Sequence, residues 1–309
     1  MTKKALVDQV LSGRAVERPP LSFWYHFGVQ HGGGEALAKI ALDYFFHYDL
    51  DFLKVMNDYF YPMPEGVTTI KTKSDLQRLV RFDPAESTWR EQFMALAIIG
   101  RALEDKAYFM DTVFDPWQSL NRWLAAENMQ HLMERESQAL LDALDVVADN
   151  LIDYCKVSIG TGAAGIFLTI PAGSEILSRK AFLTFVKPFA HKVLAAIEGL
   201  APMTTLHVHG KDLYFDDVLD LPAPVFNWWD RGPNGPSLQQ VRSKISGCVM
   251  GGIDQTLVAR RSRDWLKDHV SEALQLGGDR RFFLANGCSI DTWVCPGAVS
   301  IMVETARRK

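Results

Sequence analysis

Apolar and polar positions along this chain follow two recurring patterns. Short runs rich in β-branched and aromatic residues, typical of buried strands, are each followed by stretches with the helical period of 3.6 residues. The pattern predicts eight strands, at residues 21–25, 50–56, 107–112, 165–170, 203–206, 224–227, 248–252 and 281–285. It predicts helices at 35–47, 74–80, 87–103, 116–126, 136–156, 178–197, 211–219, 237–244, 263–276 and 297–307.

Eight successive strand and helix units are typical of a (β/α)8 barrel, the TIM barrel, whose parallel strands are joined by crossover helices. We therefore predict an α/β fold in which residues 1–309 form a single barrel domain. A doubly wound open sheet is the alternative topology. In a barrel the active site lies in the loops that follow the strands, so those loops are where candidate chemistry is sought.

Composition narrows the classes of function. The chain has 309 residues, 48% of them hydrophobic, and a net charge of -4, which favours neither nucleic acid nor an anionic membrane as a partner. No apolar run approaches the ~18 residues of a spanning helix, and Asp8 and Gln9 interrupt the N-terminal apolar stretch before it reaches signal-peptide length. Four cysteines without a Cys-x-x-Cys pair indicate a reducing, cytoplasmic location.

Polar residues follow nearly every predicted strand. Because the carboxyl ends of the barrel strands share one face, these side chains are candidates for a common site. Two tryptophans after the sixth strand, Trp228 and Trp229, are candidates for the wall of a cofactor pocket. The polar set comprises His26, Asn57, Asp58, Asp111, Ser174, Glu175, His207, His209, Asp230, Asp254, Asn286 and Cys288.

The sharpest motif is Leu206-His207-Val208-His209-Gly210. Alternate residues of an extended segment point to the same side, so both imidazoles can face one point above the barrel. With Cys288 after the eighth strand they make a set of two histidines and one thiolate, which fits tetrahedral zinc with an open position. The alternative interpretation is structural: two histidines bonded to backbone and a small buried cysteine.

These residues lie within a wider pattern. In order along the chain it comprises Arg18-Pro19-Pro20-Leu21-Ser22-Phe23-Trp24, the strand ending at Asp58, Ile176-Leu177-Ser178, Phe185-Val186-Lys187-Pro188, the His-x-His motif, Gly251-Gly252-Ile253-Asp254, and Asn286-Gly287-Cys288 with Pro296. In order and spacing the chain resembles the uroporphyrinogen decarboxylase superfamily, a set of single-domain (β/α)8 barrels. The resemblance covers most of the sequence.

The superfamily contains tetrapyrrole decarboxylases. The resemblance implies, for that branch, two arginines in the first loop that hold substrate carboxylates and an aspartate after the second strand. Asp58 matches the aspartate, but the loop of residues 24–31 contains no arginine. A substrate with several carboxylates needs fixed cationic donors, so uroporphyrinogen is an unsuitable substrate.

The second branch consists of zinc-dependent methyltransferases that act between corrinoids and thiols. It carries His-x-Cys after the fifth strand and a cysteine after the eighth, so His207 and Cys288 match while His209 replaces a cysteine. This replacement keeps a metal ligand but makes it neutral, which leaves the metal more Lewis acidic. Such a site could equally activate a hydroxyl or polarise a carbonyl.

The leading hypothesis is a zinc-dependent methyl or alkyl transferase acting on a small molecule, with a corrinoid, a corrinoid protein or a pterin as methyl donor. His207, His209 and Cys288 would hold the metal, with Asp230, Glu175 or solvent as a fourth ligand. Asp58 and His26 are the candidate catalytic residues, and Trp228 and Asp254 the candidates for cofactor binding. A metal-free lyase acting on a small acid and a non-catalytic tetrapyrrole- or corrinoid-binding barrel are the alternatives.

Overall fold

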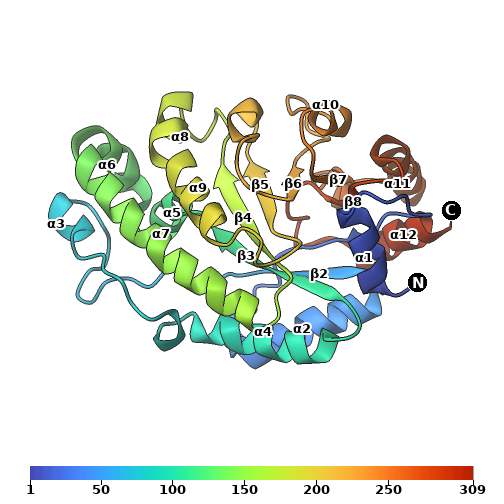
Figure 1. Cartoon of the computed structure of the whole chain (residues 1–309), viewed down its shortest axis with the longest axis horizontal. Coiled ribbons are helices and arrows are strands. Elements are labelled where there is room, and N and C mark those ends of the chain that lie inside the picture. The colour runs from blue at the N-terminus through green and yellow to red at the C-terminus, as the bar shows by residue number, and fades with distance from the viewer. Residues whose placement is uncertain (309) are drawn as a thin grey trace.

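Eight parallel strands curl into a barrel in the computed structural model, which describes residues 1–308 (Figure 1). The hydrogen-bonded order is β1-β8-β7-β6-β5-β4-β3-β2, so the strands from β2 to β8 each pair with the next in sequence, and β8 pairs with β1. The strands are β1 (Leu21–Ser22), β2 (Phe52–Val55), β3 (Tyr108–Phe114), β4 (Gly165–Pro171), β5 (Thr205–His209), β6 (Val225–Trp228), β7 (Cys248–Ile253) and β8 (Phe282–Asn286).

The seam between β1 and β2 closes the ring. The backbone amide of Asp51 donates to the carbonyl of Leu21 over 2.9 Å. The Asp51 carboxylate accepts from the Leu21 amide at 3.0 Å and from both guanidinium nitrogens of Arg18. The Asp51 side chain is buried, so its negative charge would be uncompensated without the bidentate ion pair to Arg18. The predicted single-domain (β/α)8 barrel is confirmed.

Helices surround the strands on the outside of the ring (Figure 1). They are α1 (Lys3–Leu11), α2 (Gly33–His47), α3 (Lys73–Leu76), α4 (Arg90–Leu103), α5 (Pro116–Leu120), α6 (Met129–Arg135), α7 (Ser137–Gly160), α8 (Arg179–Phe185), α9 (Lys187–Ala196), α10 (Leu238–Arg242), α11 (Arg263–Gly277) and α12 (Pro296–Arg307). The helix predicted at 178–197 is two helices, because the ring of Pro188 removes a backbone donor near the break at Val186. The helix predicted at 116–126 passes into a π-helical turn, Asn121–Ala125.

Alternation along the strands separates two apolar layers. One layer packs between the strands and the surrounding helices. The other fills the barrel itself and includes Phe52, Met110, Phe167, Met250 and Phe283. Helix α1 was not predicted from the sequence. It contributes three apolar side chains to this inner layer, namely Leu6, Val7 and Val10. The interior is therefore a packed core, and any ligand must bind where that core ends, at the carboxyl ends of the strands.

None of the helices within residues 1–308 has both the length and the apolar character needed to cross a membrane.

Candidate metal centre

Strand β5 presents both histidines of the His-x-His motif. The strand extends to His209, beyond the predicted end at residue 206. Both histidines therefore lie within the strand, two residues apart, and their imidazoles point to the same side. Their ring centroids are 5.7 Å apart. His207 is buried and stacks on Phe167 of β4, whereas His209 is exposed at the strand end. The pair thus extends from the core to the open face of the barrel.

Asn227 on β6 fixes the orientation of His207. Its Oδ1 lies 2.6 Å from Nδ1 of the histidine. Its Nδ2 donates to the backbone carbonyls of Met250 and Asn286, at 3.0 and 3.1 Å, which only an NH2 group can do. Oδ1 therefore faces the ring as an acceptor, and Nδ1 of His207 must carry the proton. This tautomer leaves Nε2 of His207 with a free lone pair for a metal.

The loop Asn286-Gly287-Cys288 places the thiol. Asn286 ties β8 to the loop after β1, since its Oδ1 accepts from the Trp24 amide at 3.1 Å and its Nδ2 donates to the Cys288 carbonyl. A Cβ on Gly287 would lie 2.6 Å from the Trp228 carbonyl oxygen, closer than a side chain can approach. Glycine thus lets the loop pass tightly over β6, and Cys288 arrives above the barrel axis.

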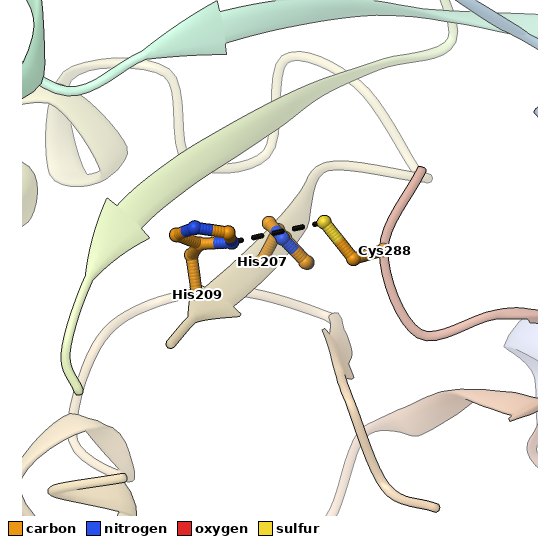
Figure 2. A group of neighbouring side chains, drawn as sticks. All are labelled: His207, His209 and Cys288. Atoms are coloured by element: carbon orange, nitrogen blue, oxygen red, sulfur yellow. Dashed lines mark hydrogen bonds between the residues drawn. The ribbon is translucent and has the colours of Figure 1, made fainter. Parts of the chain in front are cut away.

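The three side chains converge on one point (Figure 2). The ligand atoms that His207, His209 and Cys288 offer all lie within 4.8 Å of one another. The Sγ of Cys288 is 3.7 Å from Nδ1 of His209. Zn–N and Zn–S bonds of about 2.0 and 2.3 Å at a tetrahedral angle put N and S about 3.5 Å apart. The separation of Cys288 and His209 is therefore close to that of two zinc ligands.

The charges of the cluster suit a metal as well. Burial alone would raise the pKa of the Cys288 thiol, but hydrogen bonds and charge from both histidines hold that pKa well below its ordinary value. Burial lowers the pKa of His209, but Cys288 and Glu175 outweigh this effect and raise it above that of a free imidazole. The lowered pKa favours the thiolate of Cys288, which is the form that ligates zinc.

A small pocket opens beside the cluster. It has a volume of about 110 Å³, well below the roughly 300 Å³ of the smallest drug-sized ligand sites. His26 from the loop after β1 lines it, and Nδ1 of His26 lies 2.6 Å from Oδ1 of Asp58. The two candidate catalytic residues are therefore brought together as a pair at the rim of the pocket that also contains His207, His209 and Cys288.

Three further pocket residues were missed by the sequence analysis: Lys54, Gln118 and Arg122. Lys54 sits between Phe52 and Met56 on the inward face of β2, and a charged residue inside an apolar strand was a signal available in the sequence. Burial lowers the pKa of Lys54 to about 7, while Cys288, Asp58 and Asp111 oppose the shift. Gln118 and Arg122 come from α5 and the π-helical turn, where no periodicity distinguishes them.

Neither of the residues considered as a fourth ligand belongs to the three-residue cluster. Oδ1 of Asp230 accepts from the backbone amide of Gly252 at 2.9 Å. Burial raises the pKa of Asp230 to about 7, and the residue is not part of the three-residue cluster. Glu175 is exposed and accepts from the Lys211 amide at 2.6 Å. With two histidines and one thiolate as the protein's contribution, the fourth position is open to solvent or substrate.

Three other residues singled out in the sequence face away from the pocket. Strand β6 continues to Trp228, one residue past its predicted end, so alternation points this buried side chain outward, where it packs on Phe215.

Asp254 accepts hydrogen bonds from the Thr256 amide and the Trp229 indole, which makes it part of a turn. Asp111 lies in the middle of β3 and accepts from Tyr154, Ser158 and Gln92. The geometry thus gives neither Trp228 nor Asp254 a position suited to cofactor binding.

Comparison with known families assigns the chain to one of them. The family model described as uroporphyrinogen decarboxylase (URO-D) matches residues 61–309, which include His207, His209 and Cys288. The chain belongs to the uroporphyrinogen decarboxylase family. A comparison with curated proteins finds no match.

Several solved structures share the barrel fold of this member of the uroporphyrinogen decarboxylase family. A methyltransferase from Methanosarcina mazei is 18% identical, with a TM-score of 0.84 over 99% of this chain and 98% of its own. A candidate vitamin-B12-independent methionine synthase from Listeria monocytogenes is 12% identical, with a TM-score of 0.58 over 88% and 86%. An endo-1,4-β-mannanase from Rhizomucor miehei is 11% identical, with a TM-score of 0.53 over 94% and 98%. At such identities these likenesses establish the fold, which hosts many chemistries.

Proposed function

We propose that this protein is a zinc-dependent methyl or alkyl transferase, with His207, His209 and Cys288 as the metal ligands. The observation that carries the proposal is the convergence of these three ligand atoms within 4.8 Å at the carboxyl ends of β5 and β8. The catalytic face of the barrel is where such a site belongs. A methyltransferase from Methanosarcina mazei shares the fold over 99% of this chain, and methyl transfer is proposed on that likeness.

Three protein ligands and an open position distinguish catalytic from structural zinc. When bound here, zinc would lower the pKa of an acceptor thiol and so make it nucleophilic at neutral pH. The sulfur would attack the methyl carbon of a corrinoid, pterin or other small donor, forming the S–C bond as the donor–carbon bond breaks. The electron pair of that bond would leave with the donor. The small pocket suits a small acceptor rather than a bulky one.

His26 and Asp58 are assigned to proton transfer. A thiol that becomes a nucleophile must release its proton to a nearby base. His26 lines the pocket, and its contact with Asp58 fixes the ring and stabilises the imidazolium that forms. Asp58 thus acts as a positioning residue and His26 as the base.

Zinc dependence tests the proposal. We expect protein that is stripped with a chelator to lose transfer of a methyl group from methylcobalamin or an N5-methyl pterin to a small thiol, and to regain it when zinc is added. Thioether formation, measured by mass spectrometry, reports the transfer. His207→Ala should remove activity, whereas His191→Ala, an exposed histidine on α9, should leave it unchanged.

Two results would contradict this assignment. Thioether formation that survives complete removal of zinc would show that the cluster is not a catalytic metal site. Release of carbon dioxide from a small acid, unaffected by chelator and lost in Asp58→Asn, would instead establish the metal-free lyase.

A further inference from the structure

Three donor groups in the small pocket have no oxygen or nitrogen acceptor within residues 1–308. Nζ of Lys54 contacts only the sulfur of Met56, at 2.8 Å, and the rings of Phe167 and Trp24. Nε2 of Gln118 is buried with no hydrogen-bond partner within residues 1–308. Arg122 rests its guanidinium 4.0 Å above the Phe114 ring and forms no ion pair in the described part of the chain.

Such an arrangement is unfavourable unless a ligand completes it. Lys54 is 5% and Gln118 4% exposed, so water cannot solvate their donors as it would at the surface. A buried ammonium without a counter-charge and a buried amide without an acceptor both cost free energy. Proteins tolerate these costs where the missing partner is a bound group, and here both donors line one cavity.

The charge balance specifies the sign of the missing group. The Cys288 thiolate is the anion that contributes most to the charged form of Lys54, but a metal ion at the cluster would take up that negative charge. Asp58 is already bonded to His26. With zinc in place, the pocket presents the Lys54 amine and the Arg122 guanidinium beside a positive centre, which favours an anionic ligand; the charge of that ligand in turn favours the protonated form of Lys54.

We propose that Lys54, Gln118 and Arg122 form an anion-binding subsite for the carboxylate of a small acceptor whose thiol reaches the metal centre. The Gln118 amide, the Lys54 amine and the Arg122 guanidinium all offer N–H donors to one pocket, and a planar carboxylate offers two oxygens to receive them. The subsite stands on different elements from the first-loop arginines of the tetrapyrrole decarboxylases, because it is built from β2 and from the segment after β3. The choice of a thiol carboxylate as acceptor rests on the proposed function.

Calorimetric titration of two thiols of similar size tests the subsite. We expect zinc-loaded protein to bind 3-mercaptopropionate about 10- to 100-fold more tightly than 1-propanethiol, because only the former offers an anion to charged donors. Lys54→Met, which keeps the length and apolar stem of the side chain, should abolish this preference. Lys71→Met, an exposed lysine outside the pocket, should retain it. Gln118→Leu should reduce it.

A titration with propionate separates this inference from the proposed function. If metal-free protein binds propionate and Lys54→Met does not, the subsite stands even when no zinc or thiol chemistry is found. If zinc-loaded protein binds both thiols equally and propionate not at all, the subsite is refuted while the metal centre remains. A preference for 3-mercaptopropionate that Lys54→Met leaves unchanged would also overturn the proposal.

Discussion

Cys288→Ser is expected to lower the affinity for zinc by about 100- to 1,000-fold and to abolish methyl transfer, while the barrel stays folded. Four-ligand zinc sites bind with about 10–16 kcal/mol, so each ligand contributes roughly 3–4 kcal/mol. Serine keeps the size of the side chain but not the thiolate that both histidines stabilise. Zinc per chain after dialysis against a competing chelator measures the effect.

The same substitution elsewhere in the chain provides the control. Cys295 is exposed, lies just before α12 and is not part of the cluster. Cys295→Ser should therefore bind zinc as the unmodified protein does. Equal zinc retention by the two variants would show that Cys288 is not a ligand.

Asn227→Ala is expected to weaken zinc binding by about 10- to 100-fold although Asn227 touches no metal. Without its Oδ1, the tautomer and the orientation of His207 are no longer fixed. The carbonyls of Met250 and Asn286 also lose their donor, which should cost about 2–4 kcal/mol of stability. Zinc affinity and the free energy of unfolding of the metal-free protein are the two measurements.

A second buried asparagine separates the effect on the metal from the effect on folding. Asn150 makes three comparable hydrogen bonds, donating to Tyr61 Oη and the Val80 carbonyl and accepting from the Phe82 amide, far from the cluster. Asn150→Ala should thus lose a similar amount of stability and keep its zinc affinity. If both variants lost affinity in proportion to stability, Asn227 would be a structural residue only.

Periodicity predicted the barrel because each strand is a short, predominantly apolar run and most crossovers contain an amphipathic helix. The same reasoning placed His207, His209 and Cys288 on one face, since parallel strands end together and alternate residues share a side. The convergence of these three residues could thus be anticipated from spacing before any distance was known.

Strand ends were harder to place, and they decide whether a residue belongs to a strand, where its side is fixed by alternation, or to a loop. Trp228 was assigned to a loop, but β6 includes it and turns it outward. Asp111 was placed near the end of β3, which in fact continues to Phe114. Lys54 was overlooked because its neighbours in sequence are apolar. The role of Asn227 depends on which carbonyls lie beside it, and these belong to β7 and β8.

X-ray absorption spectroscopy at the zinc edge of the loaded protein tests the central claim most directly. Two histidines and one cysteine predict two nitrogen scatterers at about 2.0 Å and one sulfur at about 2.3 Å, with one lighter ligand or an added thiol in the remaining position. The sulfur contribution should vanish in any zinc still held by Cys288→Ser. A spectrum of the unmodified protein with nitrogen and oxygen ligands but no sulfur, or protein that retains no zinc at all, would contradict the account.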